Sequence, residues 1–190
     1  MQRLGPAELT LAEIATEAGL TAGALVQRYG SKRALMIALA EAVAASAGDM
    51  IRALRQKHRS PLAAIRAYGS CMAQMASTPE ALARNLAYLT EDISDPDRRG
   101  HLLVQSRATR EGLEELLDEA VASGELKPET DTRMLARTLE TVIGGALFTW
   151  AVYREGTAQR MMAEHVDAVL LPHRRARKRH RRSGGAQNST

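Results

Sequence analysis

Residues that build disulfides, metal sites and membrane spans are scarce in this chain of 190 residues. The single cysteine, Cys71, excludes an internal disulfide and a paired-cysteine metal site, and it fits a reducing compartment. No stretch approaches the roughly 20 uninterrupted apolar residues of a transmembrane helix, and the N-terminus has no apolar core of the signal-peptide type. We therefore expect a cytoplasmic protein without a membrane partner.

Aromatic residues are also scarce, at 3% of the chain, whereas alanine, leucine and methionine are plentiful. Aromatic and β-branched residues favour strands, and the unbranched residues that dominate here favour helices. The apolar fraction of 45% and the charged fraction of 25% are those of an ordinary globular protein. The composition therefore predicts an all-α fold.

Helix boundaries can be read from capping residues. A capping residue followed by proline at the first helical position predicts helices near 61–76, 79–92 and 96–122. Further helices are predicted to start after Thr10, Thr21, Ser31 and Asp131, and the one after Ser31 is expected to continue through Leu54. Pro172 is expected to stop the last helix.

Acidic residues are missing altogether from the segment 173–182. This segment carries seven of the 26 lysines and arginines, so the rest of the chain holds 19 basic residues against 22 acidic ones. Such a cluster attracts any polyanion without reading its sequence, although a solvated extension without a partner has the same composition. We predict a basic, disordered tail over residues 173–190.

The most informative pattern is a turn between two short helices. Ala15 is small enough to let the two helices approach closely, and Gly19 can adopt the positive φ that the turn requires. This pattern is typical of a helix-turn-helix, whose second helix enters the major groove of DNA. The apolar seam between the helices is predicted to consist of Ile14, Ala18, Leu20 and Leu25.

From Thr10 to Leu35 the sequence resembles the tetracycline-repressor (TetR) family of bacterial transcriptional regulators. The residues at the family's motif positions are Thr10, Ile14, Ala15, Ala18, Gly19, Leu20, Thr21, Gly23, Leu25, Tyr29, Ser31, Lys32 and Leu35. The resemblance implies a helix-turn-helix head followed by a larger helical ligand-binding and dimerisation bundle. It also implies a homodimer that binds double-stranded DNA at a pseudo-palindromic operator and responds to a small-molecule effector.

Two departures from the family pattern bear on DNA binding. Val26 stands where the family usually has a tyrosine that touches a phosphate. Nine residues precede Thr10, where family members carry a further helix, and we interpret residues 1–31 as a head truncated at its N-terminus. The apolar backs of the two motif helices are then expected to lack part of their cover.

Helical geometry selects the surface that would face DNA. Leu25 and Tyr29 share the buried side of the second helix, which turns Gln27 to the opposite side, where it matches an adenine edge. Arg28 matches a guanine edge or a phosphate, and the resemblance makes Lys32 a phosphate anchor. For Gln27 and Arg28 the alternative is an ordinary exposed polar residue. The predicted DNA-binding residues are Thr10, Thr21, Ala22, Gly23, Ala24, Val26, Gln27, Arg28 and Lys32.

The remaining helices offer candidates for a pocket for a small apolar ligand. Soft or amphipathic side chains adapt to ligands of varied shape, and an arginine can pair with an anionic ligand. Plain core packing, or a surface position for the arginine, is the alternative for each residue. The predicted ligand-binding residues are Met50, Tyr68, Met72, Met75, Tyr88, Arg107 and Phe148.

The segment 142–152 is apolar nearly all round, so a helix there must be covered on more than one side. Its two adjacent glycines permit close approach of another backbone. With the last helix it predicts a four-helix dimer interface, and a central core helix in a monomer is the alternative. The predicted dimerisation residues are Gly144, Gly145, Trp150, Val166 and Leu170.

No catalytic constellation is recognisable. The five histidines show no i, i+4 metal pair, and no serine or cysteine lies in a nucleophile motif. We predict no enzymatic activity, no cofactor and no metal. The sequence favours a dimeric, ligand-responsive repressor associated with the bacterial nucleoid. The alternative is a ligand-binding bundle whose DNA-binding head does not function. The predicted domains are the head at 1–31, a ligand-binding and dimerisation domain at 32–172, and the tail.

Overall fold

The computed structural model describes residues 6, 9–76 and 78–175. Within these residues it contains helices and a single isolated β-bridge, which confirms the all-α prediction. The elements are α1 (Leu11–Glu17), α2 (Ala22–Tyr29), α3 (Lys32–Ala45), α4 (Ala47–Lys57), α5 (Pro61–Met75), α6 (Pro79–Ser94), α7 (Pro96–Ala122), α8 (Thr132–Tyr153), α9 (Ala158–Leu170) and the 3₁₀ turn Leu171–His173.

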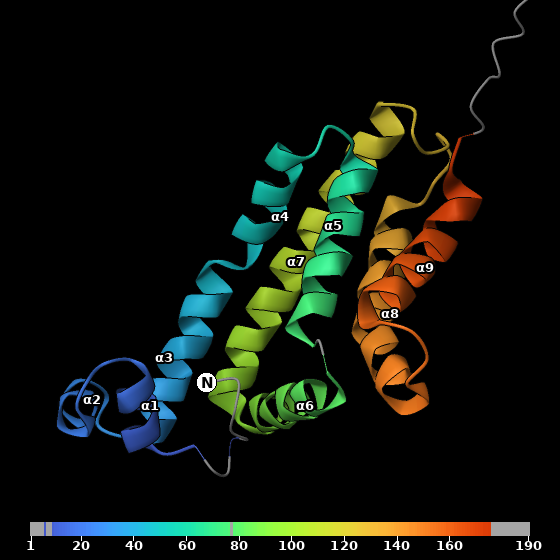
Figure 1. The fold of residues 1–190 in the computed structure, drawn as a ribbon. Coiled ribbons are helices and arrows are strands. Elements are labelled where there is room, and N and C mark those ends of the chain that lie inside the picture. Colours follow the sequence, from blue (N-terminus) through green and yellow to red (C-terminus); the bar gives the residue numbers. More distant parts are fainter. Residues whose placement is uncertain (1–5, 7–8, 77, 176–190) are drawn as a thin grey trace, which may run out of the picture.

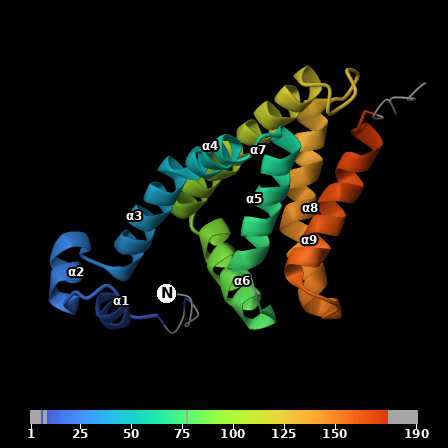
Figure 2. The ribbon, with the colours of Figure 1, turned by 45° about the horizontal axis from the view of Figure 1, so that its top comes forward.

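The molecule is elongated, with α1 and α2 at one end and the last described residues at the other (Figure 1). We call residues 9–31, which contain α1 and α2, the head. Helices α3 and α4 lead away from the head along α7, and α5, α8 and α9 pack together on the far side (Figure 2). Helix α7 is the longest element and contacts α3, α4, α5, α6 and α8, so it joins the head end to the rest of the bundle.

The main core lies among α5, α7, α8 and α9, where their apolar faces meet. These helices bury complete leucine and isoleucine side chains, each of which stabilises the folded state by about 1.5–3 kcal/mol relative to exposure. The largest fully buried side chains are Leu62, Ile65, Leu113, Leu117, Leu126, Leu139, Met162, Val166 and Leu170.

The predicted caps form as expected. The Ser60 hydroxyl accepts a hydrogen bond from the Ala63 N–H and the Thr78 hydroxyl from the Ala81 N–H, each one residue before a proline at the first helical position. The Asp95 carboxylate accepts from the backbone N–H groups of Asp97 and Arg98. Local capping chemistry therefore sets these helix starts, and each predicted end lies within two residues of the observed one.

The single long helix predicted after Ser31 is wrong, because the structure divides it at Ser46 into α3 and α4. Both the N–H and the hydroxyl of Ser46 bond back to the carbonyl oxygens of Ala42 and Val43. A serine that bonds to the preceding turn in this way bends a helix. The bend keeps α4 in contact with α7.

Residues Lys32–Lys57, which span α3 and α4, have a mean hydropathy of 1.6 over their most apolar window, of which 17% is buried. By length and composition this segment is apolar enough to cross a membrane, but Glu41, Ser46 and Asp49 interrupt it, so it is not an uninterrupted apolar stretch of about 20 residues. In the structure it packs on α7 along one side. Apolar side chains on another side of α3, such as Leu39 and Val43, are exposed.

Helices α5 and α9 approach each other closely at Gly69. A Cβ atom at this position would lie 3.2 Å from Met162 Cγ and 3.3 Å from Val166 Cγ2, closer than ordinary van der Waals contact. Since Met162 and Val166 are themselves buried, neither side chain can move into solvent. The absence of a side chain at residue 69 therefore allows these two helices to pack.

We expect Gly69→Leu to lower the free energy of unfolding by about 1–3 kcal/mol, because the added side chain overpacks the contact between α5 and α9. The measurement is urea denaturation followed by circular dichroism. Gly100→Ala is the matched control, since a Cβ atom there meets nothing within 4 Å. It should raise stability by about 0.5–1 kcal/mol through helix propensity. Equal effects of the two changes would contradict this description of the packing.

Candidate nucleic-acid interface

Helix α1 begins with the predicted capping box. The Thr10 hydroxyl accepts from the Glu13 N–H, and the Glu13 carboxylate accepts from the Thr10 N–H at 2.7 Å and from its hydroxyl at 2.8 Å. These bonds hold the pKa of the Glu13 carboxyl below its ordinary value, the backbone N–H of Thr10 having the largest effect. The box satisfies N–H groups that a helix start would otherwise leave unpaired.

The turn between α1 and α2 has the predicted geometry. Gly19 has a φ of 66°, and the Leu20 N–H bonds back to the Ala15 carbonyl oxygen at 2.8 Å. Ala15 is 1% exposed, consistent with its place where the helices meet. The Thr21 hydroxyl then caps α2 by accepting from the Ala24 N–H at 3.2 Å. Two short helices at a fixed angle result, which is the geometry of a helix-turn-helix.

The core of the head is small, and part of the predicted seam is wrong. Ala18 and Leu20 lie at the surface, with Leu20 52% exposed, because no described element covers the turn on that side. Tyr29 of α2 and Tyr88 of α6 pack against the edge of the core. The buried residues of the head are Leu9, Ile14, Ala15 and Leu25, together with Leu35 of α3.

The outward face of α2 is accessible along its length. Gly23, Ala24, Val26, Gln27 and Arg28 are all exposed, while Leu25 is buried, as the helical spacing predicted. The Arg28 guanidinium lies 5.4 Å from the centre of the Tyr29 ring, a distance that allows a cation–π contact. Of the remaining predicted DNA-binding residues, Thr10 and Thr21 are exposed and Ala22 is half-buried. Side chains on this face can therefore reach another molecule without any rearrangement of the head.

Lys32 differs from its predicted position. Its side chain is partly buried, and its ammonium group donates a hydrogen bond to the Pro6 carbonyl oxygen. The chain before α1 thus passes the first turn of α3, and its Pro6 carbonyl oxygen accepts a hydrogen bond from the ammonium group that was predicted to contact a phosphate. The ammonium group has three N–H donors, so a phosphate contact by Lys32 would share the group with this bond or replace it.

The neighbouring Arg33 ties α3 to α7. Its guanidinium bonds to both carboxylate oxygens of Asp95 at 2.9 and 3.0 Å and to Asp97 at 2.8 Å. Because Asp95 also caps α7, the head end of α3 is fixed to the first turn of α7. The side chain of Arg33 is 56% exposed, so this contact positions the helices more than it stabilises the fold.

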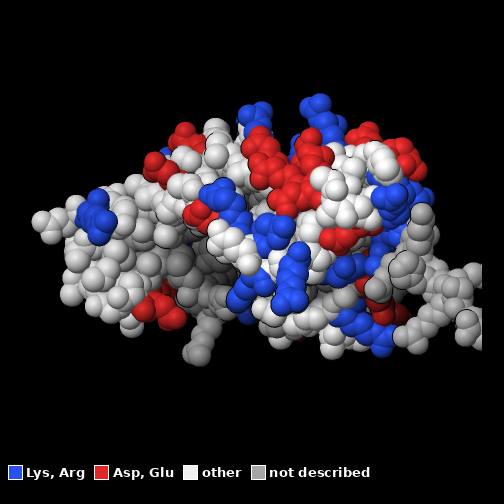
Figure 3. Space-filling model, turned by 90° about the horizontal axis from the view of Figure 1, so that it is seen from above, with Lys and Arg blue, Asp and Glu red and all other residues white. Residues whose placement is uncertain are grey.

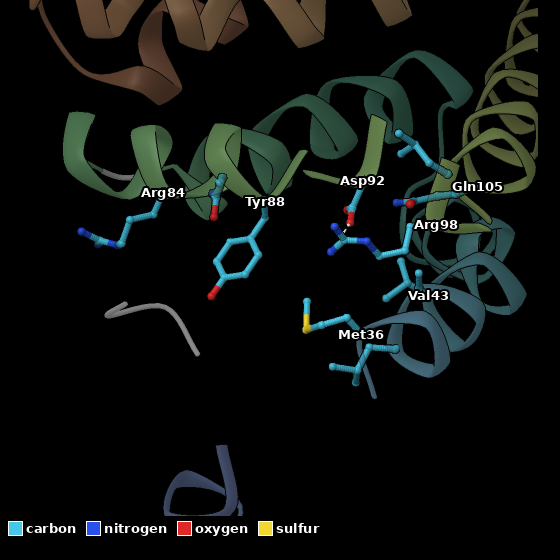
Figure 4. A pocket seen from close by; sticks show the side chains of 11 residues that line it. Met36, Val43, Arg84, Tyr88, Asp92, Arg98 and Gln105 are labelled. Atoms are coloured by element: carbon cyan, nitrogen blue, oxygen red, sulfur yellow. Dashed lines mark ion pairs between the residues drawn. The ribbon is translucent and has the colours of Figure 1, made fainter. Parts of the chain in front are cut away.

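An elongated groove lies between α3, α6 and α7, next to the head (Figure 4). Its volume is about 340 Å³, within the range of small-molecule sites. Its apolar wall comes mainly from α3, and α6 and α7 contribute most of the polar groups (Figure 4). The lining residues are Met36, Leu39, Ala40, Val43, Arg84, Asn85, Tyr88, Asp92, Arg98, Leu102 and Gln105.

Arg98 is the most buried charge beside this groove, at 8% exposed. Its guanidinium pairs with Asp92 at 3.3 Å and Glu91 at 3.2 Å, whereas its Nε has no hydrogen-bond partner among the described residues. Burial raises the pKa of the Asp92 carboxyl, and the charge of Arg98 opposes this rise. Burial also raises the pKa of the Tyr88 hydroxyl. The groove thus combines an apolar wall with groups that can orient a ligand.

The predicted ligand-binding residues do not form one site. Only Tyr88 lines this groove; Tyr68 is buried in the core, and Met72 packs against it. Arg107 is exposed, and so are Met50, Met75 and Phe148, on different helices. The prediction that these residues line one pocket is therefore wrong. The type of an apolar residue does not show whether its side chain lies in a core, at the surface or in a cavity. The residues it missed, such as Met36 and Leu39, belong to the unusually apolar stretch of α3.

The surface of α8 and α9 also differs from the prediction in part. Trp150, Val166 and Leu170 are 7%, 1% and 0% exposed within one chain, so they face its core and cannot form an interface. They are buried because α8 and α9 pack their larger apolar residues against each other and against α5. Gly144 and Gly145 do face outward, on the same stripe of α8 as the exposed Phe148 and Val152.

A capped helix-turn-helix with an open second helix, joined to a larger helical bundle, defines a DNA-binding regulatory protein. Comparison with known proteins agrees. The family model for bacterial regulatory proteins of the tetR family matches residues 1–39. The transcriptional regulatory protein RaaS of Mycobacterium tuberculosis is 30% identical over 164 residues, which cover 85% of this chain and 72% of RaaS. The chain therefore belongs to the tetR family of transcriptional regulators.

Solved structures share the fold at lower identity. The fatty acid degradation regulator FadR of Bacillus halodurans has a TM-score of 0.68 at 17% identity, covering 91% of each chain. A TetR regulator of Haloarcula marismortui has a TM-score of 0.67 at 20% identity, covering 88% of this chain and 90% of its own. SmeT in complex with triclosan has a TM-score of 0.68 at 21% identity, covering 89% and 83%. Family and neighbours are regulators and not enzymes, as predicted.

We expect the Glu13 carboxyl to titrate below the ordinary glutamate pKa, because both Thr10 bonds favour its ionised form. The bonds therefore stabilise α1 fully above the ordinary value, and this stabilisation is lost as the pH falls through the lowered one. Carbon-detected NMR of the carboxyl measures the midpoint, and amide exchange of α1 follows the helix. In Glu13→Gln the exchange should lose this pH dependence. A midpoint at or above the ordinary value would contradict the capping box.

Proposed function

We propose that this protein is a homodimeric, ligand-responsive repressor that acts in the bacterial cytoplasm, at the nucleoid, on a pseudo-palindromic operator. The observation that supports this most directly is the open face of α2 on an intact helix-turn-helix. Its exposed residues are small at the N-terminus of the helix, where Gly23 and Ala24 let the backbone approach DNA, and polar further along.

In this proposal Gln27 and Arg28 read base edges in the major groove, and Thr10, Thr21 and Ala22 lie at the sugar-phosphate backbone. Gln27 pairs with adenine through N6 and N7, and Arg28 with guanine or a phosphate once it leaves the Tyr29 ring. Val26 meets a thymine methyl group or the backbone. Lys32 contacts a phosphate through an N–H group that its bond to the Pro6 carbonyl oxygen leaves available, or by exchanging that bond.

We expect Gln27→Ala to weaken operator binding by about 1–3 kcal/mol and to relax the preference at a single base position. The operator is first selected from a random duplex library, and affinities are measured by fluorescence anisotropy at fixed salt. Arg99→Ala is the control, because Arg99 is exposed on α7, away from α2. Unchanged affinity and selectivity of Gln27→Ala would disprove its role as a base reader.

One alternative has support in the structure. Leu20 is exposed and Lys32 is already engaged, as expected for a head that does not function, leaving a ligand-binding bundle. Selection from the random duplex library separates the repressor from this alternative, because a head that does not bind DNA enriches no duplex sequence.

The proposed dimer uses the outward stripes of α8 and α9. Gly145, Phe148 and Val152 recur every three or four residues along α8 and are exposed, and the adjacent Gly144 is exposed as well. Two glycines let a partner helix approach closely, and the adjacent aromatic and valine side chains supply apolar area. A two-fold dimer would present two α2 helices to DNA, with half-sites about 34–36 Å apart.

We expect Gly145→Arg to produce monomers in sedimentation velocity. A side chain at residue 145 meets nothing within 4 Å in one chain, so the substitution should leave the subunit folded while it blocks close approach of a partner. Gly100→Arg, at an equally open position on α7, is the control and should leave the mass unchanged. If Gly145→Arg still sediments as a dimer, the interface lies elsewhere.

We place the effector site in the groove between α3, α6 and α7. Helix α3 buries Leu35 in the core of the head and presents Met36, Leu39 and Val43 to the groove. A ligand that favours another position of α3 would move the head relative to the body and alter its fit to DNA. Linkage then requires that operator DNA weaken ligand binding by the same factor, typically worth about 1–3 kcal/mol. The complex of SmeT with triclosan supports binding of a small apolar molecule by this fold.

We expect the amphipathic anionic dye 8-anilinonaphthalene-1-sulfonate to bind the groove, and Leu39→Trp to abolish this binding by filling it. Leu103→Trp is the control, because Leu103 is exposed on α7 outside the groove. Calorimetry with and without the selected operator measures the coupling. Dye binding that survives Leu39→Trp would place the site elsewhere, and equal dye affinities in the two titrations would rule out coupling.

A further inference from the structure

Asp92 is the acidic residue among those that line the groove between α3, α6 and α7. It lies in the last turn of α6, one helical turn after Tyr88, and both side chains extend toward Met36 and Val43 of α3 (Figure 4). Its side chain is 29% exposed, so it is neither buried in the core nor fully in solvent. A molecule that enters this part of the groove therefore meets a carboxylate.

Asp92 belongs to a network of ion pairs in which negative groups outnumber positive ones. Two arginines, Arg33 and Arg98, pair with four carboxylates where α6 meets α7, and Arg98 lies 3.3 Å from Asp92. Over the bundle, on the face shown in Figure 3, acidic and basic side chains are interspersed, so this surplus of negative charge is a local feature. Asp92 is the one of the four carboxylates that lines the groove. The four are those of Glu91, Asp92, Asp95 and Asp97.

Arg98 also lines the groove, but its charge is already engaged. Both of its terminal nitrogens donate to one Glu91 carboxylate oxygen, at 3.3 and 3.2 Å. Its Nε has no hydrogen-bond partner among the described residues, yet this atom is buried, so a ligand in the groove cannot reach it without a rearrangement. The side chain of Arg98 is 9% exposed, against 29% for Asp92. Asp92 is therefore the more accessible charge at this end of the groove.

The other cation of the groove, Arg84, lies away from Asp92 (Figure 4). Arg84 precedes Asp92 by eight residues of α6, which at a rise of about 1.5 Å per residue is about 12 Å along the helix. At physiological salt the field of an exposed charge is screened within about 8 Å. A positive group held at Asp92 is therefore little repelled by Arg84.

We propose that the effector carries a positive charge, in an ammonium or amidinium group that pairs with Asp92, on an apolar body that lies along α3. The inference rests on the groove being the effector site, as proposed above. The Tyr88 ring, one turn from Asp92, has a face that attracts a cation. Met36, Leu39 and Val43 form the wall against which the apolar body packs. Burial raises the pKa of the Asp92 carboxyl, and a positive partner in the groove opposes this cost of burial.

Three compounds with the same apolar body test the charge: phenylbutylammonium, phenylbutanol and phenylbutyrate, each with a terminal phenyl ring. Their affinities for the full chain are measured by isothermal titration calorimetry at neutral pH and about 0.15 M salt. We expect the ammonium compound to bind about tenfold more tightly than the carboxylate, because Asp92 attracts the first and repels the second.

Asp92→Asn removes the charge and keeps the shape of the side chain. It should weaken binding of the ammonium compound about tenfold, leave the alcohol unchanged, and tighten binding of both the carboxylate and the anionic dye used above about threefold. A change in the shape of the groove would weaken all four ligands alike, so the opposite directions identify an effect of charge. Asp97→Asn is the matched control, because Asp97 belongs to the same network but does not line the groove. It should leave all four affinities within about twofold.

Equal affinities of the ammonium compound and the carboxylate would overturn the inference, and so would an effect of Asp92→Asn that is the same for all ligands. Tightest binding by the carboxylate would overturn it too, and would assign the groove to anionic ligands. Absence of binding by the ammonium compound, or binding that survives Leu39→Trp, would show that the groove does not hold such a cation.

Failure of the proposed function has a different signature. If operator DNA leaves the affinity of the ammonium compound unchanged, the groove is not coupled to the head, while the preference for a cation and its loss in Asp92→Asn still support this inference. Conversely, coupling of dye binding to the operator, without any preference among the three compounds, keeps the effector site and overturns the inference about its ligand.

Discussion

Helix α3 is the element on which the arrangement of the head depends. Its first turns contact both the head and the bundle. Leu35 is buried in the core of the head, with Ile14, Ala15 and Leu25. Arg33 is bonded to the first turn of α7. Among the described residues, the head has no other extensive contact with the bundle apart from the edge of Tyr88. Any movement of α3 relative to α7 therefore changes the direction in which α2 points.

The head is small, and its stability is correspondingly limited. It buries four of its own apolar side chains plus Leu35, and a cluster of this size stabilises a fold only weakly by itself. The capping box at Thr10, the cap at Thr21 and the contact with Tyr88 of α6 supplement it. Tyr88 of α6 both packs against the core of the head and lines the groove. A molecule bound in the groove would therefore contact α3, which joins the head to the bundle, and Tyr88, which supports the head.

The sequence by itself determined the elements and the family. Capping residues, prolines and the pair Ala15 and Gly19 act within one or two helical turns, so they predicted the helix starts and the helix-turn-helix from local geometry alone. The open face of α2 followed for the same reason, since helical spacing fixes which side chains oppose Leu25. Tertiary packing decided the rest. It buried Trp150, exposed Leu20 and scattered the predicted pocket residues, because an apolar side chain has no local preference between a core, a cavity and a surface. It also turned Lys32 toward Pro6, because that contact joins residues far apart in the sequence.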